Sequence, residues 1–211
     1  MLFAMIQNWE IRKRARETLK GNWTVPVLVM LFLFLISAAA SALLDDIYWI
    51  VLVVFLGAMC FGRVSVMLML VRKKSPQISN MFDGFKILEK TVPLSLLMTL
   101  FVLLWTLLLI IPGIVAAFRY SMSFYLLYDN PKLSPKQAIA KSKEMMHGYK
   151  AKLFWLELSF IGWYLLGILT LCIAWFWIAA YQNTATAIFY EELKKEKGFQ
   201  AKPAQKQKKK R

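Results

Sequence analysis

Three long apolar stretches, separated by clusters of basic residues, constrain this chain more than any other feature. They run from about Val25 to Val71, from Pro93 to Tyr128 and from Leu153 to Tyr190. A straight helix over either of the last two would be roughly 55 Å long, whereas the hydrocarbon core of a bilayer is about 30 Å thick. Each stretch must therefore fold back on itself. The sequence predicts three helical hairpins, and thus about six membrane crossings.

The turns of these hairpins are marked unequally. Asp45-Asp46 divides the first stretch, and Pro112-Gly113 is the expected break in the second. The third carries only a weak signal, between Gly167 and Cys172. The first two hairpins are therefore better defined than the third.

The positions of the basic residues predict the orientation of the chain in the membrane. The chain has a formal net charge of +15 although 59% of its residues are hydrophobic. Of its 27 Lys and Arg residues, 25 lie before, between or after the hairpins, on one side of the predicted membrane. The opposite side has only Asp45-Asp46 and short turns. Because basic loops stay in the cytoplasm, both termini are expected to be cytoplasmic, in a bacterial plasma membrane.

The expected fold is an all-α, polytopic transmembrane helical bundle with cytoplasmic interfacial helices. Its predicted segments are a cytoplasmic amphipathic N-terminal helix (residues 1–23), a first hairpin (24–71), a cytoplasmic interfacial segment (72–92), a second hairpin (93–128), a cytoplasmic helix (129–152), a third hairpin (153–190) and a basic cytoplasmic tail (191–211).

The cytoplasmic segments resemble one another. Residues 16–23 and 143–150 both read as the last turns of an amphipathic helix that ends at a glycine, Gly21 or Gly148. Ser134-Pro135 and Ser75-Pro76 are helix-start signals. Either the chain repeats one unit three times, or basic interfacial helices simply look alike. We expect these helices to lie on the inner leaflet, with their apolar faces toward the lipid and their cations toward anionic headgroups.

Several ordered motifs resemble an uncharacterised family of bacterial integral membrane proteins, the domain of unknown function 975. They are Leu19-Lys20-Gly21-Asn22-Trp23, Ile111-Pro112-Gly113-Ile114, Tyr120-Ser121-Met122-Ser123, Asp129-Asn130-Pro131, the run from Ser134 to Gly148, and Leu158-Ser159-Phe160-Ile161-Gly162-Trp163. The resemblance implies a multi-pass membrane protein, with no established activity, cofactor or active site. The chain departs from the family pattern at 173–177, where no glycine marks the turn.

Four residues within the apolar stretches form a candidate polar cluster: Arg63, Arg119, Glu157 and Tyr120. A charge at the centre of a membrane helix costs about 3 kcal/mol, so such residues face protein or water and find partners. One interpretation is an inward-facing cavity in which an arginine left without an acid meets an anionic group. The other is structural: Glu157 pairs with one arginine and joins two hairpins, while the second arginine reaches backbone carbonyls or lipid phosphate.

No catalytic, cofactor or metal site is expected. The sequence lacks phosphate-loop, nucleophile-elbow and zinc-protease motifs, and Cys60, Cys172 and His147 are too few for a metal centre. The leading prediction is a non-enzymatic membrane-organising or accessory protein. The alternative is a small transporter or lipid-handling protein with an inward-facing anion site, and an enzyme ranks third. Expected partners are the bilayer, its anionic inner-leaflet lipids and a second copy or another membrane protein, with no nucleic acid.

Overall fold

The computed structural model describes residues 5–43, 48–168, 170 and 173–198, and every regular element in them is a helix. The elements are α1 (Asn8–Leu19), α2 (Thr24–Leu43), α3 (Tyr48–Val71), the 3₁₀ helix η1 (Ile78–Ile87), α4 (Leu88–Leu108), α5 (Ile110–Tyr120), α6 (Ser123–Asp129), α7 (Pro135–Met145), α8 (Lys150–Leu158), α9 (Ile161–Ile168) and α10 (Trp175–Glu196). The predicted all-α class is confirmed. The predicted turn at Asp45-Asp46, Cys172 and residues 199–211 of the tail lie outside the described residues.

Three helical segments among the described residues are long and apolar enough to cross a membrane: Ile78–Leu108, Ile110–Asp129 and Lys150–Ile168. A fourth candidate arises if α1 and the following helix, which meet at an angle of 98°, count as one broken span. By length and composition, the chain therefore has the candidate spans of a membrane protein.

The turn in the second apolar stretch lies at Leu109, three residues before the predicted Pro112-Gly113. Leu109 has extended backbone angles (φ −161°, ψ 144°), which end α4 and start α5. Pro112 falls in the first turn of α5, where a helix needs no backbone N–H from it. Gly113 instead permits close packing, since a Cβ there would lie 2.1 Å from Thr106 Oγ1 on α4. The proline-glycine pair thus starts the second helix of the hairpin rather than forming its turn.

The third apolar stretch contains two interruptions. One lies between Ile168 and Trp175, in the region predicted for the turn. The other, between α8 and α9 at Ser159-Phe160, was not predicted. Helices α9 and α10 approach closely at Gly167, where a Cβ would lie 2.4 Å from the Trp175 ring. These contacts support a fold-back of this stretch.

Local signals at the ends of the helices between the apolar stretches are confirmed at α1 and α7. Ser134 caps α7: its hydroxyl accepts a hydrogen bond from the Gln137 backbone N–H, and the Ser134 N–H donates one to Gln137 Oε1. Gly21 and Gly148 follow α1 and α7 with φ of +82° and +86°, the left-handed conformation that glycine adopts most easily. The third such element, η1, begins at Ile78 with Gln77 as its N-cap, so the predicted start at Ser75-Pro76 lies two residues too early.

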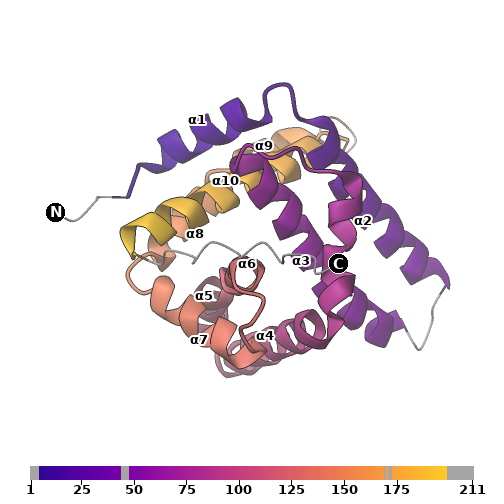
Figure 1. The fold of residues 1–211 in the computed structure, drawn as a ribbon, viewed down its shortest axis with the longest axis vertical. Helices are drawn as coiled ribbons and strands as arrows, with labels where there is room; N and C mark the ends of the chain where they lie inside the picture. The colour runs from indigo at the N-terminus through magenta and orange to yellow at the C-terminus, as the bar shows by residue number, and fades with distance from the viewer. Residues whose placement is uncertain (1–4, 44–47, 169, 171–172, 199–211) are drawn as a thin grey trace, which may run out of the picture.

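The apolar face of α1 packs on protein. Ile11, Ala15 and Leu19, spaced four residues apart, are fully buried. Helix α1 lies alongside α10, at the top of Figure 1, while α4, α5 and α7 lie on the opposite side. Helix α7 likewise buries its apolar face against α4 and α6. The expectation that these faces point toward lipid is corrected: an apolar stripe can be covered equally well by neighbouring helices.

Candidate functional site

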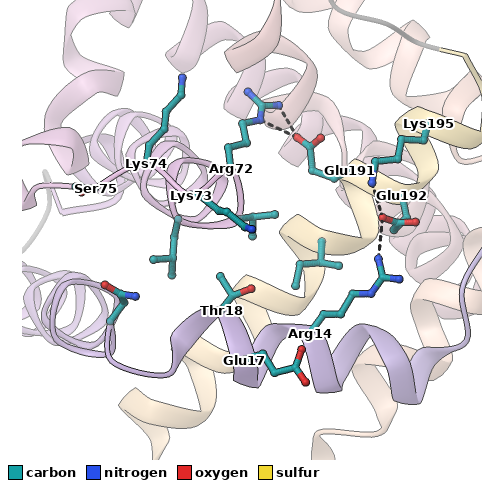
Figure 2. A pocket seen from close by; sticks show the side chains of 14 residues that line it. Arg14, Glu17, Thr18, Arg72, Lys73, Lys74, Ser75, Glu191, Glu192 and Lys195 are labelled. Carbon is teal, nitrogen blue, oxygen red and sulfur yellow. Dashed lines mark hydrogen bonds and ion pairs between the residues drawn. The ribbon is translucent and has the colours of Figure 1, made fainter.

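A cavity of about 860 Å³ opens between α1, the C-terminal end of α3 and α10. Charged side chains dominate its lining (Figure 2). The cations are Arg14, Arg72, Lys73, Lys74 and Lys195, and the acids are Glu17, Glu191 and Glu192. We call it the basic cavity. Its volume is in the range of small-molecule binding sites.

Arg72 joins three helices at one wall of this cavity. Its Nε and Nη2 donate to Glu191 Oε1 of α10 at 2.8 and 2.5 Å, and Nη2 lies 2.7 Å from Asp129 Oδ1 at the end of α6. Burial alone would lower the pKa of the Arg72 guanidinium, but hydrogen bonds to Glu191 and Asp129 outweigh it and raise that pKa above its ordinary value. Arg72 is therefore held in ion pairs with Glu191 and Asp129.

Asp129 is the most enclosed charged member of this network, with only 3% of its side chain exposed. Besides Arg72, it pairs with Lys194 and accepts a hydrogen bond from the Tyr190 hydroxyl at 2.8 Å. Its carboxylate is thus bound by two cations and one hydroxyl from α10 and the end of α3. Sequence reasoning missed this network because its members lie 57 to 65 positions from Asp129, in segments predicted separately.

A second, more exposed set of pairs closes the cavity toward α1. Arg14 lies 2.6 Å from Glu10 Oε1 on its own helix and 3.2 Å from Glu192 Oε1 on α10. Lys195 also contacts Glu192, at 2.8 Å. Exposed pairs of this kind contribute less than about 1 kcal/mol each, so they orient the side chains more than they stabilise the fold.

Lys73 differs from the other cations of the cavity. It is the only described residue besides glycine with a positive φ, 56°. Its N–H donates to Leu70 O at 3.0 Å and the Lys74 N–H to Met69 O at 2.9 Å. These two bonds form a Schellman motif, in which glycine usually occupies the position of Lys73.

The left-handed backbone directs the Lys73 side chain. In Figure 2 it lies toward the space between α3, α1 and α10, whereas Lys74 extends away from α1. Among the described residues, Lys73 forms no ion pair with an acid. A costly backbone conformation therefore presents an ammonium group without an acidic partner to the cavity.

The sequence-predicted cluster lies elsewhere, in the bundle. Glu157 of α8 accepts hydrogen bonds from the Gln182 amide and, at 2.9 Å, from the Thr186 hydroxyl, both on α10. The Tyr164 hydroxyl of α9 donates to Gln182 Oε1 at 2.5 Å. Glu157 thus joins the parts of one predicted hairpin, not two hairpins. Within the described chain it forms no ion pair with Arg63 or Arg119.

Arg63 lies on α3, a helix that packs against α10. Its Nη2 lies 3.9 Å from Cys60 Sγ. Its Nε is buried and has no hydrogen-bond partner among the described residues. The guanidinium is therefore incompletely satisfied.

Arg119 and Tyr120 face a different set of neighbours. The Arg119 carbonyl accepts a hydrogen bond from Ser142 Oγ of α7 at 2.8 Å, and the Tyr120 ring is buried. The Lys143 ammonium lies over that ring, 5.4 Å from its centre, and Phe101 packs beside it. Arg119 and Tyr120 therefore belong to the contacts of α5 with α4 and α7, apart from the hydrogen bonds of Glu157.

Comparison with known proteins identifies a family. The family described as "Protein of unknown function (DUF975)" matches residues 5–116 and 106–197. The chain belongs to the DUF975 family. The resemblance predicted from the sequence motifs is thereby confirmed. Neither a curated protein nor a solved structure matches the chain significantly.

The two DUF975 matches include all residues of the basic cavity, from Arg14 to Lys195, and the cluster around Glu157. They leave out the basic residues at the end of the chain, from Lys202 onward. Both polar sites therefore lie in the part of the chain that matches the DUF975 family, and the family description adds no activity to them.

Proposed function

We propose that this DUF975 protein crosses a bacterial plasma membrane six times, as three hairpins, with both termini in the cytoplasm. The hairpins would be α2 with α3, α4 with α5 and α6, and α8 and α9 with α10. Helices α2 and α3 have 20 and 24 residues, so each is at least about 30 Å long. The one-sided distribution of Lys and Arg supports the orientation.

Labelling of single cysteines tests this topology. In a background with Cys60 and Cys172 changed to serine, Asp45→Cys should react with an impermeant maleimide added to intact cells. Ser75→Cys should react only after the membrane is permeabilised. Reaction of Asp45→Cys from the inside alone would contradict the first hairpin and the orientation.

At the cytoplasmic face we propose a non-enzymatic role: the protein binds a phosphate-bearing anion in the basic cavity, as a membrane-organising or lipid-handling protein. The observation that carries this proposal is Lys73, whose left-handed backbone presents an unpaired ammonium to the cavity. Five cations against three acids leave the lining positive. Arg72 and Arg14 are held by acids, so they supply the positive field while Lys73 supplies the direct contact.

Phosphate suits this site better than a carboxylate of one charge. It offers several acceptor oxygens to donors arriving from different helices, and Lys binds it as a point charge. The Thr18 hydroxyl and Asn22 amide, which also line the cavity, add neutral donors. The group can be the headgroup of an anionic lipid or a soluble phosphate ester, since both present the same chemistry.

A titration with pyrophosphate tests the binding site. The full chain is placed in nanodiscs of phosphatidylcholine, and binding is measured as a rise in its unfolding temperature. We expect Lys73→Ala to weaken binding about tenfold, or by about 1.4 kcal/mol, and Lys74→Ala to weaken it much less. Equal effects of the two variants would contradict the proposed role of Lys73, and no binding by the wild type would contradict the soluble ligand.

A second arm separates lipid from soluble ligand. Nanodiscs containing phosphatidylglycerol should stabilise the wild type more than Lys73→Ala if the headgroup enters the cavity. The double variant Lys132→Ala/Lys136→Ala removes two exposed cations outside the cavity and serves as the control. If it reduces stabilisation by phosphatidylglycerol as much as Lys73→Ala does, the lipid interacts with general surface charge and not with the cavity.

Arg63 favours a second candidate function, a small anion transporter. Its Nε is buried and has no hydrogen-bond partner among the described residues, and a guanidinium N–H in that position can bind an anion inside the membrane. Anion flux into proteoliposomes should then fall in Arg63→Gln and persist in Arg119→Gln. Absence of anion flux in the wild type would contradict this second function.

A further inference from the structure

An apolar groove of about 530 Å³ lies between α5 and α8, apart from the basic cavity. Its walls include Ile111, Ile114 and Phe118 of α5, and Ala151 and Phe154 of α8. The rings of Phe118 and Phe154 meet edge to face at 5.8 Å. Ile111 is 75% exposed, so one end of the groove is open to the surroundings.

The dimensions suit a slender apolar ligand. Ile111 and Phe118 are seven residues apart on α5, which corresponds to about 10 Å along the groove. A helix with its side chains is about 10–12 Å wide, so a partner helix would cover the groove rather than enter it. A hydrocarbon chain lying along α5 can fill it, and the small side chain of Ala151 leaves room for one.

One charged residue lines the groove. Lys150 begins α8, is half-buried, and forms no ion pair with a described acid. The other residues that line the groove are apolar or glycine. In the proposed topology Lys150 stands at the cytoplasmic boundary and Ile111 nearer the opposite side. The groove therefore has the polarity of a phospholipid: a cation where the phosphate lies and apolar walls where the acyl chain lies.

We propose that this groove binds one acyl chain of an anionic inner-leaflet phospholipid, whose phosphate contacts Lys150. The inference rests on the membrane placement proposed above but not on the basic cavity. It differs from ordinary solvation by lipid, because a groove lined by Phe118 and Phe154 and carrying one cation, Lys150, selects one lipid position and one headgroup charge.

Photo-cross-linking in nanodiscs tests the acyl-chain contact, with phosphatidylglycerol that carries a diazirine in its acyl chain. Ala151→Phe fills the groove and should reduce cross-linking to α5 and α8 about tenfold. Ala117→Phe introduces the same ring at another exposed alanine, on α5 but not among the groove residues, and should leave cross-linking unchanged. Ile111→Trp repeats the test at the open end, where the wild-type side chain is mostly exposed.

If Ala151→Phe cross-links as much as Ala117→Phe, and Ile111→Trp cross-links as much as the wild type, the groove does not bind the acyl chain. Lys150→Glu should abolish the preference for phosphatidylglycerol over phosphatidylcholine while cross-linking persists; an unchanged preference would overturn the headgroup contact. Recovery of the wild type in the soluble fraction of cells would contradict the membrane placement itself. If only the groove proposal fails, the protein stays in the membrane fraction but the variants cross-link equally.

Discussion

Two regions of the bundle, the junction of α3, α6 and α10 and the contact of α8 with α10, each hold a carboxylate, and they satisfy it differently. Asp129 is bound by Arg72, Lys194 and the Tyr190 hydroxyl, so charges compensate one another. Glu157 is bound by the neutral donors of Gln182 and Thr186, while Arg63 on α3 has an Nε without a hydrogen-bond partner in the described part of the chain. The first arrangement ties helices together. The second leaves a cation without an acid, as at Lys73, and we propose that such cations are the places where an external anion binds.

Removal of the charge on Asp129 is the strongest test of this comparison. Asp129→Asn leaves Arg72 and Lys194 without their shared acid in a nearly buried position, and breaking a buried pair in this way costs about 3–5 kcal/mol. We expect a loss of that size in the free energy of unfolding, measured in mild detergent.

The matched control is Glu10→Gln, which breaks the exposed pair of Arg14 within α1 and should cost less than about 1 kcal/mol. If both variants lose the same stability, the Asp129 network does not hold α3, α6 and α10 together. The contrast between the two regions would then disappear.

The Glu157 carboxylate should have a smaller effect. Glu157→Leu leaves the Gln182 amide without an acceptor, whereas the Thr186 hydroxyl can still donate to the Gln182 backbone carbonyl at 3.0 Å, so we expect a cost of about 1–3 kcal/mol. Adding Gln182→Leu removes this unsatisfied group, so part of the stability should return, and a double-mutant cycle measures the coupling. A loss as large as that of Asp129→Asn would show that Glu157 carries a charge pair after all.

Local rules made the helix ends of this chain predictable, whereas the helix partners were not. Ser134 and Gly148 act through backbone groups within a few residues, so the sequence alone indicates the bounds of α7. Pro112 was misread because proline suits the first turn of a helix as well as a turn between helices. The stripe of Ile11, Ala15 and Leu19 reads the same whether lipid or α10 covers it.

The candidate sites show the same limit. From its charge, Glu157 was expected to pair with an arginine inside the membrane. Its partners are instead neutral donors such as Gln182, which carry no distinctive signal in the sequence. The network around Asp129 depends on tertiary contacts over more than fifty residues. Nothing in the sequence separates Lys73 from Lys74, since the difference lies in a backbone angle that only the fold defines.

A substitution at Gly148 tests the cost of the left-handed helix end. Gly148→Ala should destabilise the protein by about 1 kcal/mol, because φ of +86° is unfavourable for a residue with a Cβ. No atom lies within 4 Å of a Cβ at this position, so a steric clash does not contribute. The unfolding free energy should fall equally for Gly148→Ala and Gly148→Ser; no loss in either variant would mean that this helix end can change its backbone without cost.

Replacing Lys73 by glycine should change the free energy of unfolding least among these variants, and it is the substitution expected to raise it. Lys73→Gly relieves the left-handed strain, offset in part by the greater freedom of glycine in the unfolded chain, so we expect a net stabilisation of about 0.5–1 kcal/mol. The same change removes the unpaired ammonium and should weaken pyrophosphate binding about as much as Lys73→Ala does. Lys74→Gly, at a position with an ordinary φ, should give no such gain. A variant that is more stable yet binds less would show that the end of α3 keeps a strained lysine for its ligand. Loss of stability in Lys73→Gly would instead assign the lysine a structural role and undo the contrast with Gly148.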